Sequence, residues 1–393
     1  MKNEVICSAV HKFCAPLYIF DLDAFAARFR FFKEAFGEEI QINYCMKTNP
    51  FLTQASLDYT DRIEVCSYGE FLICKELRIE PKRLLISGVL KKYEDMEDIM
   101  NYCGSEAIYT AESVSQWNII NELAMGRGLR VNVYMRLNCG QFGMDEDTIL
   151  SLLKNETHSG ICFYGIHYFT GTQKMNLKKH EKEIARLDAL FRRIQAETGQ
   201  KVEHLEYGTG FGVAYFTDQE EPFTRDVLLQ FHRLLLQMEW KGEISLEMGR
   251  ALAYDCGYYV TRVRDLKTTE GKNICICDGG IHQTNYDGQL RGMYQPYTRV
   301  LHRNIGAQRE NQTYTVYGSL CTTNDVLMTN FECEELELGD LLVFERVGAY
   351  SLYEGMSLFL SHELPGVCLY SEKDYLLPVR IQQETYRLNT ICF

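Results

Sequence analysis

The stretch Ile42-Asn43-Tyr44-Cys45-Met46-Lys47-Thr48-Asn49-Pro50 carries the pattern that decides the fold, a short apolar run that ends on a lysine and a turn. The run has the length and composition of a buried β-strand. Charged side chains are rarely buried alone, so Lys47 at the mouth of a strand points to chemistry. Desolvation pushes an ε-amine toward its neutral, nucleophilic form, as a Schiff base with an aldehyde cofactor requires. The alternative is a solvated surface lysine.

The same alternation continues between residues 41 and 250, where short apolar runs alternate with segments of helical period. The helical segments include 68–77, 114–125, 177–197 and 225–237. Eight strands are predicted, at 42–46, 63–66, 84–86, 107–109, 131–137, 162–166, 202–207 and 244–246. Eight β/α units over this length are typical of a (β/α)8 TIM barrel.

Polar residues at the ends of these strands support the barrel. They are Lys47, Ser67, Ser87, Arg136, His167, Gly208 and Glu247. The carboxyl ends of the strands form the active face of such a barrel. A doubly wound sheet shows the same alternation, so the prediction depends on the strand count and on this polar ring.

After about residue 265 the pattern changes to strands without intervening helices, at 273–277, 313–317, 341–346, 367–370 and 375–381. We therefore expect three parts: an N-terminal segment, 1–20, that adds a strand to the β domain; a cofactor-binding barrel, 21–265; and a mainly β C-terminal domain, 266–393. Asp21 or Asp23 is expected to cap the first helix of the barrel.

Composition limits the function. The 393 residues include 41 Lys and Arg against 54 Asp and Glu, a formal charge of -13, so nucleic acid is not an expected partner. No apolar run reaches the length of a membrane span, and no export signal is evident. The 15 cysteines are odd in number and include no C-x-x-C pair, so we expect reduced core residues, no metal site and a cytoplasmic protein.

Two further segments carry candidate ligand contacts. The turn 208–212, which begins Gly208-Thr209-Gly210, can offer backbone N–H groups to a phosphate, although it is also compatible with a plain flexible turn. Glu247-Met248-Gly249-Arg250 follows the eighth strand. Glu247 can bind a protonated ring nitrogen, and the amides of Gly249 and Arg250 can extend the phosphate site. A structural ion pair is the alternative for this segment.

These motifs resemble those of the fold-type III pyridoxal-phosphate decarboxylases, which act on ornithine, arginine and diaminopimelate. The similar segments occur in the family's order and span nearly the whole chain: 44–49, 64–70, 167–173, 208–212, 247–250, 318–325 and 348–350. The resemblance implies pyridoxal 5'-phosphate on Lys47 and an obligate head-to-tail homodimer with shared active sites. It also implies that Cys321 enters the neighbouring subunit's site and that Tyr350 lies at the cofactor phosphate.

Three departures from the family concern the faces that contact the cofactor ring and the substrate; in addition, Met248 replaces the family's proline in 247–250. Within 167–173, Phe169 stands where a histidine normally stacks on the cofactor ring. Thr172 in the same segment is a further candidate cofactor contact. Thr322, in the segment 318–325 that ends on Asp325, replaces the acidic residue that faces the distal amine of a diamino acid substrate. Gln295 replaces the arginine that binds the distal carboxylate of diaminopimelate. We expect Thr322, Asp325 and Gln295 to contact substrate. The segments 165–173, 278–282, 320–322 and 359–362 are more similar to a natural-product branch, some members of which resemble decarboxylases of carrier-tethered amino acids.

The sequence therefore predicts a pyridoxal-phosphate-dependent decarboxylase of an amino acid or an amino-acid-derived substrate. Lys47 holds the cofactor, Glu247 keeps its ring nitrogen protonated, and Cys321 is the general acid. The alternatives are decarboxylation of a free diamino acid, amino acid racemisation, and an inactive regulatory homologue. A basic cluster after the sixth strand, comprising Lys174, Lys178, Lys179, His180 and Lys182, could bind an acidic acyl or peptidyl carrier protein, although a solvated helix start is equally compatible.

Overall fold

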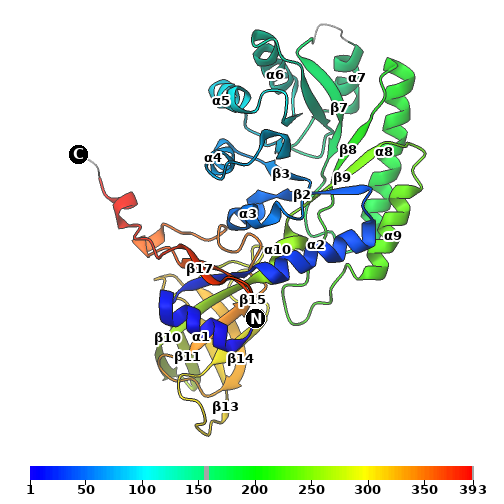
Figure 1. Cartoon of the computed structure of the whole chain (residues 1–393). Helices are drawn as coiled ribbons and strands as arrows, with labels where there is room; N and C mark the ends of the chain where they lie inside the picture. The colour runs from blue at the N-terminus through cyan, green and yellow to red at the C-terminus, as the bar shows by residue number, and fades with distance from the viewer. Residues whose placement is uncertain (155–158, 392–393) are drawn as a thin grey trace. The chain divides into compact units, whose positions relative to one another are not determined.

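Eight parallel strands close into a barrel in the computed structural model of the chain, which describes residues 1–154 and 159–391 (Figure 1). Each strand pairs with the next, and the last pairs with the first. The barrel strands are β2 (Ile40–Cys45), β3 (Arg62–Val65), β4 (Leu84–Ile86), β5 (Ile108–Ala111), β6 (Val131–Arg136), β7 (Ile161–Tyr168), β8 (His204–Gly208) and β9 (Glu243–Met248). The predicted barrel is confirmed, with each predicted strand in its place.

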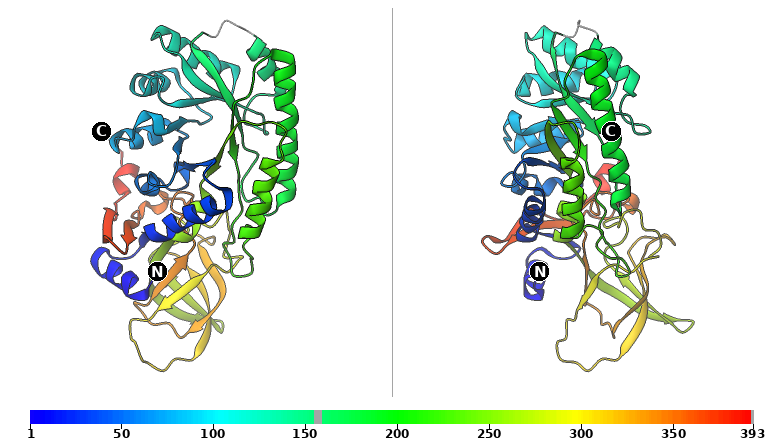
Figure 2. Two further views of the ribbon diagram at one scale, coloured as in Figure 1. Left: turned by 45° about the vertical axis from the view of Figure 1, so that its right-hand side comes forward. Right: turned by 90° about the vertical axis from the view of Figure 1, so that its right-hand side faces the viewer.

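Helices follow the strands and cover the outside of the barrel (Figure 1). They are α3 (Thr53–Ser56), α4 (Tyr68–Glu76), α5 (Tyr93–Cys103), α6 (Val114–Gly126), α7 (Glu146–Lys154), α8 (Leu177–Thr198), α9 (Arg225–Leu236) and α10 (Arg250–Ala253), with α2 (Leu22–Phe36) before β2. The long helix α8 packs beside α9, and both are green in Figure 2. Several helices are capped at their N-termini by side chains that accept hydrogen bonds from backbone N–H groups, for example Ser67 at α4 and Asn176 at α8.

A nine-stranded sheet forms the second unit of the chain. Its strands are β1 (Leu17–Asp21), β10 (Gly257–Thr269), β11 (Lys272–Cys277), β12 (Thr298–Leu301), β13 (Asn311–Tyr317), β14 (Val326–Glu334), β15 (Leu341–Glu345), β16 (Gly366–Ser371) and β17 (Tyr375–Arg380). The helix α1 (Asn3–Phe13) buries Ile6, Ala9 and Val10 against the apolar side chains of this sheet.

The first strand of the chain lies inside this sheet, between β10 and β16. Leu17 is paired with Val260 on one side and with Gly366 on the other. All five residues of β1 are buried, which explains its uninterrupted apolar run. Asp21 then caps α2, because its Oδ1 accepts hydrogen bonds from the amides of Asp23 and Ala24 at 3.0 Å.

The two units divide the chain differently from the boundaries expected at residues 20 and 265. The sheet unit comprises Met1–Ala27, Ala214–Glu221 and Leu252–Phe393, and the barrel unit comprises Arg28–Val213 and Pro222–Ala251. Residue 265 lies within β10, which pairs with β1, β11 and β15. A strand held on both edges cannot be divided between two units, so the boundary falls before β10.

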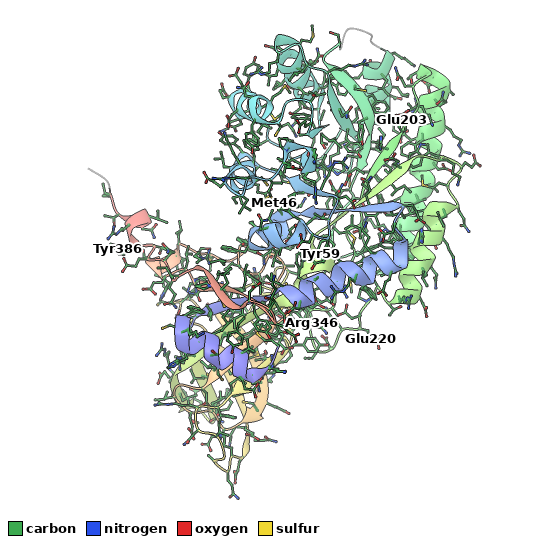
Figure 3. The ribbon with its side chains drawn as sticks, viewed as in Figure 1. Met46, Tyr59, Glu203, Glu220, Arg346 and Tyr386 are labelled. Carbon is green, nitrogen blue, oxygen red and sulfur yellow. The ribbon has the colours of Figure 1, made fainter. Side chains whose placement is uncertain are left out.

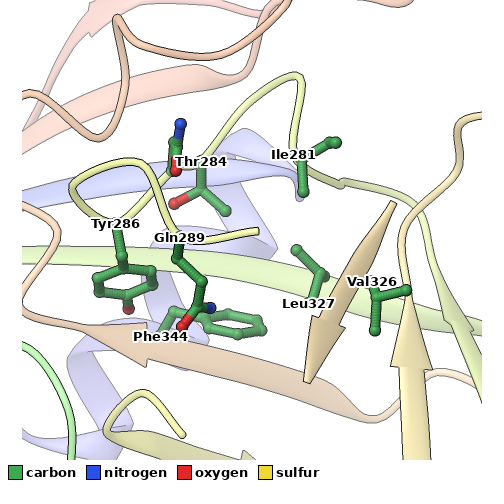
Figure 4. A pocket seen from close by; sticks show the side chains of 8 residues that line it. Ile281, Thr284, Tyr286, Gln289, Val326, Leu327 and Phe344 are labelled. Atoms are coloured by element: carbon green, nitrogen blue, oxygen red, sulfur yellow. The ribbon is translucent and has the colours of Figure 1, made fainter. Parts of the chain in front are cut away.

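A small cavity lies inside the sheet unit (Figure 4). Its volume is about 20 Å³, and its lining includes Tyr286, Gln289, Leu327 and Phe344. That volume holds about one water molecule, so the cavity is too small for an amino acid.

The fourteen cysteines of the described residues are all free, and Cys392 lies outside those residues. Within 1–154 and 159–391, no helix combines the length and the hydrophobicity that crossing a bilayer requires.

A buried polar network supports the turn that follows β8. Lys174 Nζ donates to Glu183 Oε2 at 2.8 Å, and the Tyr207 hydroxyl donates to the same oxygen at 2.5 Å. The backbone of Lys174 pairs with the turn itself, donating to Gly210 O at 2.9 Å and accepting from Gly212 N at 3.0 Å. The network therefore ties the start of α8 to the glycine-rich turn.

This network corrects the predicted basic cluster. The side chain of Lys174 is only 1% exposed and is paired with Glu183, and His180 is fully buried, with Nδ1 at 2.8 Å from the Tyr207 hydroxyl. Burial lowers the pKa of His180 to about 3, so His180 is neutral. Only Lys178, Lys179 and Lys182 remain exposed, and a set of three lysines beside glutamates is typical of a solvated helix start.

We predict that Gly165→Ala destabilises the barrel by about 2 to 4 kcal/mol. A Cβ at Gly165 in β7 would lie 1.9 Å from the carbonyl oxygen of His204 in β8, so the two strands would have to separate. Urea unfolding measures the change. Gly126→Ala is the matched control, because nothing lies within 4 Å of that Cβ at the end of α6, and it should be neutral or stabilising by about 0.5 kcal/mol. Equal effects of the two substitutions would contradict the argument.

We also predict that Glu183→Ala costs about 3 to 5 kcal/mol of unfolding free energy, because it leaves the Lys174 ammonium buried without its partner. The double variant Lys174→Met, Glu183→Leu should recover most of that loss. Glu80→Ala, which breaks an exposed pair with Lys82, should cost less than about 1 kcal/mol. If the effects of Lys174→Met and Glu183→Leu simply add in the double variant, the two side chains do not act as a pair.

Candidate active site

Lys47 lies in a single turn, η1 (Met46–Thr48), directly after β2. Its neighbour Met46 is labelled in Figure 3. Lys47 Nζ donates to Glu64 Oε2 on β3 at 2.6 Å and lies 3.4 Å from the Sγ atom of Cys66. The Cys66 thiol in turn donates to Glu64 Oε1 at 3.0 Å. The first two strands of the barrel therefore bring an amine, a carboxylate and a thiol into direct contact.

The expectation that desolvation makes Lys47 neutral is wrong for this arrangement. Burial by itself lowers the pKa of Lys47, but Cys66 and Glu64 outweigh it and hold that pKa well above its usual range. Burial also opposes the shift at Glu64, where Lys47 nevertheless lowers the pKa to about 2. The pair is an ammonium and a carboxylate, so Lys47 must lose a proton before its nitrogen can attack a carbonyl.

Glu247 and His167 form a second buried pair. Their side chains are 4% and 1% exposed, and His167 Nε2 lies 3.0 Å from Glu247 Oε2. Among the described residues, Glu247 Oε1 has no hydrogen-bond partner. A buried carboxylate oxygen without a donor is unfavourable, so this atom fits a ligand that brings its own donor, such as a protonated ring nitrogen.

The glycine-rich turn is held close to this pair. The amide and the hydroxyl of Thr209 both donate to the Glu247 carbonyl oxygen at 3.3 Å. Gly210 has a φ of 57°, and a Cβ there would lie 2.0 Å from the carbonyl oxygen of Gly171. Among the described hydrogen bonds, none uses the amides of Gly210 and Phe211. These two N–H groups are therefore available to an anion such as a phosphate.

The other predicted contacts in the barrel unit gather around the same turn. Phe169 packs against Gly208, where a Cβ would lie 2.6 Å from the Phe169 ring. Arg250 Nε donates to Thr172 Oγ1 at 3.2 Å. Gly249 leaves room for Thr48, because a Cβ would lie 1.9 Å from Thr48 Oγ1. Glycine at 208 and 249 is therefore required by close packing within the chain itself.

Five predicted residues belong to the sheet unit. Cys321 is exposed, and Thr322 next to it is half-buried, with Oγ1 accepting from Asn324 N at 3.4 Å. Gln295 is half-buried and contacts Met328 Sδ at 3.7 Å. Tyr350 has a φ of 64°, and its carbonyl oxygen accepts from Tyr353 N at 2.7 Å.

Asp325 differs from its expected role. It is 1% exposed, and its two oxygens accept hydrogen bonds from the amides of Ile281 at 2.9 Å and Leu320 at 2.7 Å. Gly280 and Gly318 lie so close to this carboxylate that a Cβ on either would clash with it. These contacts fix the carboxylate of Asp325 within the sheet unit, and the substrate contact expected from its motif stays a prediction.

Several buried groups at the strand ends received no role from sequence. Arg136 Nη1 pairs with Glu112 Oε1 at 2.6 Å, and Lys91 Nζ donates to Gly88 O at 2.6 Å. Burial lowers the pKa of Lys91 to about 8. Only Arg136 stood out in the sequence, because it ends a predicted strand. Glu112 and Lys91 could have been predicted as site residues, because each follows the carboxyl end of a barrel strand.

Three potential metal ligands, Cys45, Glu64 and Glu247, come within 4.8 Å of one another. Lys47 already bonds Glu64, and His167 already bonds Glu247. A lysine ammonium inside the group disfavours a cation, so the donor set fits an organic cofactor better than a metal.

Comparisons with known proteins agree with this geometry. Residues 17–348 match the family model described as pyridoxal-dependent decarboxylase, C-terminal sheet domain. The L-glutamyl-[BtrI acyl-carrier protein] decarboxylase of Niallia circulans is 27% identical, with 93% of this chain and 91% of the relative covered. The 2-[(L-alanin-3-ylcarbamoyl)methyl]-2-hydroxybutanedioate decarboxylase of Staphylococcus aureus is 25% identical, with 88% and 92% covered.

A solved structure shows the same fold. The diaminopimelate decarboxylase of M. jannaschii, in complex with L-lysine, superposes with a TM-score of 0.84 at 22% identity, covering 99% of this chain and 94% of the other. The family match spans most of the chain and includes the lysine, the buried carboxylate and the glycine-rich turn described above. The chain belongs to the pyridoxal-dependent decarboxylase family, and it is an amino acid decarboxylase that uses pyridoxal phosphate.

Proposed function

We propose that the enzyme decarboxylates an amino acid whose side chain is joined to a larger acyl group or carrier, rather than a free diamino acid. The observation that carries the proposal is Thr322, a half-buried, uncharged residue beside Cys321. A distal ammonium needs a charged partner once it leaves water. Gln295, likewise uncharged, offers no cation to a distal carboxylate.

The names of two relatives support this choice. One acts on an L-glutamyl group held by an acyl-carrier protein, and the other on an alanine joined through its third carbon to a carbamoyl group. In the first substrate a glutamyl group is joined to a carrier, and in the second the alanine side chain ends in a neutral carbamoyl linkage. Such a linkage needs hydrogen-bonding groups, and a threonine hydroxyl and a glutamine amide provide them.

We assign the cofactor to the groups gathered around Lys47 in the barrel unit. Lys47 binds it covalently through Nζ, and Glu64, at 2.6 Å, is the nearest acceptor for the proton that Nζ must lose. The unpaired Oε1 of Glu247 accepts from the ring nitrogen while His167 fixes the other oxygen. When bound, pyridoxal phosphate takes up the electron pair that loss of carbon dioxide releases.

The remaining assignments surround the phosphate and the ring. Gly208, Thr209 and Gly210 bind the phosphate through the turn after β8. Gly249 and Arg250 extend that site, and Thr172 orients Arg250 through the hydrogen bond at 3.2 Å. The contact of Tyr350 with the cofactor phosphate stays a prediction from its motif. Phe169 offers an apolar face, beside which a departing carboxylate is poorly solvated.

Cys321 completes the proposal as the general acid that donates a proton to the substrate's Cα. Its exposed position in the single chain agrees with a site made by two copies, in which Cys321 of the partner subunit enters next to Lys47. The functional unit is then a homodimer with two shared sites. A cytoplasmic location belongs to the same proposal and agrees with the free cysteines.

We predict that Lys47→Ala removes the visible absorption of bound cofactor and all turnover, and that Cys321→Ala lowers turnover by roughly 10²- to 10⁴-fold. Mixing the two variants should restore about a quarter of wild-type activity, because half of randomly formed dimers are mixed and each carries one intact site. Lys201→Ala, which changes an exposed lysine, is the control. Borohydride trapping of cofactor on a peptide without Lys47, or no complementation on mixing, would contradict these assignments.

The substrate is tested by mass-spectrometric detection of carbon dioxide loss from free glutamate, lysine, ornithine and diaminopimelate, and from a glutamyl-loaded acyl-carrier protein. We expect the carrier-bound substrate to be preferred by roughly 10²-fold or more, because an unpaired distal charge is rejected. Thr322→Asp should gain turnover of lysine or ornithine. Thr323→Asp, which adds the same charge at an exposed neighbour, should not. Efficient wild-type turnover of a free diamino acid would show that the enzyme is a diamino acid decarboxylase.

A further inference from the structure

One buried carboxyl group in the barrel has no cationic partner. Glu206, on β8, is 1% exposed, and both of its oxygens accept from the same nitrogen, Asn43 Nδ2, at 2.9 Å each. No ion pair found in residues 1–154 and 159–391 includes Glu206. An ionised carboxylate in a dry interior without a cation is strongly unfavourable, so the arrangement favours a protonated acid.

Asn43 shows the complementary feature. It lies on β2, is fully buried, and its Oδ1 has no hydrogen-bond partner within the described part of the chain. A carboxylate has no hydrogen to give to this atom, whereas a carboxylic acid has one O–H donor. A neutral Glu206 therefore brings an O–H donor next to Asn43, which an ionised Glu206 cannot do.

The bond between these residues crosses the inside of the barrel. β2 and β8 are not neighbours, because β9 lies between them, so a contact between their side chains is possible only through the interior. Asn43 is level with Glu247 in the register of β2 and β9, and Glu206 lies one inward-facing position before Gly208, which is level with Glu247. Asn43 is therefore level with Glu247, and Glu206 lies one inward-facing position below it.

The charges around Glu206 agree with a neutral acid. Burial, followed by Glu247, raises the pKa of Glu206 well above its usual range. The titratable and charged groups that face it come from β3, β6, β7 and β9: Arg62, Glu64, Tyr134, Tyr164 and Glu247. Arg62 is the one cation in this set, and it forms no ion pair with Glu206 within 4.0 Å among the described residues.

We propose that Glu206 is a neutral carboxylic acid paired with Asn43, and that it is a positioning residue that keeps Glu247 the ionised carboxylate of the barrel interior. The second half rests on the proposed contact between Glu247 and the cofactor ring. If Glu206 were ionised, two carboxylates would share one buried site, and their repulsion would be unfavourable. A neutral Glu206 avoids this cost and leaves Glu247 as the carboxylate available to the ring nitrogen.

The protonation state is tested by infrared spectroscopy of the cofactor-free protein. A protonated acid has a carbonyl band above the amide region that shifts in deuterium oxide and on labelling with 13C-glutamate. We expect this band at neutral pH in the wild-type protein and its loss in Glu206→Gln. Glu203→Gln is the matched control, because Glu203, which is labelled in Figure 3, lies three residues earlier and is exposed, and the band should persist. Absence of the band from the correctly folded wild-type protein would overturn the proposal, whatever the enzyme's substrate is.

The positioning role is tested by cofactor binding. Glu206→Ala should weaken the binding of pyridoxal phosphate by roughly 10-fold or more, because Asn43, which is level with Glu247 on the adjoining strand, loses its hydrogen-bond partner. Glu206→Gln, which keeps the neutral charge and a donor, should restore most of that affinity. It should also hold the cofactor's absorption constant at alkaline pH, where the wild-type protein loses it as Glu206 ionises. Equal losses in the two variants would overturn the positioning role, and these results do not depend on which amino acid is decarboxylated.

Discussion

The burial of polar side chains inside a closed eight-stranded barrel is the constraint on which the rest of the site depends. Every charged side chain that enters this space must find a partner within it. Lys47 pairs with Glu64, His167 with Glu247, and Arg136 with Glu112. Each pair joins residues at or beside the carboxyl ends of strands, so the polar ring is a set of mutually compensating contacts rather than a row of independent groups.

Much of the barrel could be predicted because each strand is a local pattern, an apolar run with a polar residue at its end. The order of strands then follows from the closure of a parallel sheet. The sheet unit was harder to predict from the sequence. β10 begins in a buried apolar run directly after the barrel and continues as an exposed ribbon, so nothing in its sequence marks the change of unit. Its partners β1 and β15 lie far away in the chain.

The states of individual side chains were not predictable for a related reason. Lys47 is charged because its ammonium contacts Glu64. Lys174 can be buried because its ammonium donates to Glu183 and lies over the ring of Tyr207. Neither partner adjoins its lysine in sequence, and a lysine in a charged run looks the same whether it is solvated or paired. Motif order identified the residues at Lys47 and Glu247, but only the fold shows which oxygen of Glu247 is unpaired.

The position of β1 has a consequence for how the chain acquires its fold. Leu17 pairs with Val260 and Gly366, so β1 gains its first neighbour in the sheet only when β10 has been synthesised and its second only when β16 has. The barrel strands, in contrast, pair with partners that are close in sequence, apart from the closing contact between β2 and β9. Closing the long loop around β1 carries a high entropic cost, so we expect the sheet to assemble late and its apolar strand to need protection during translation.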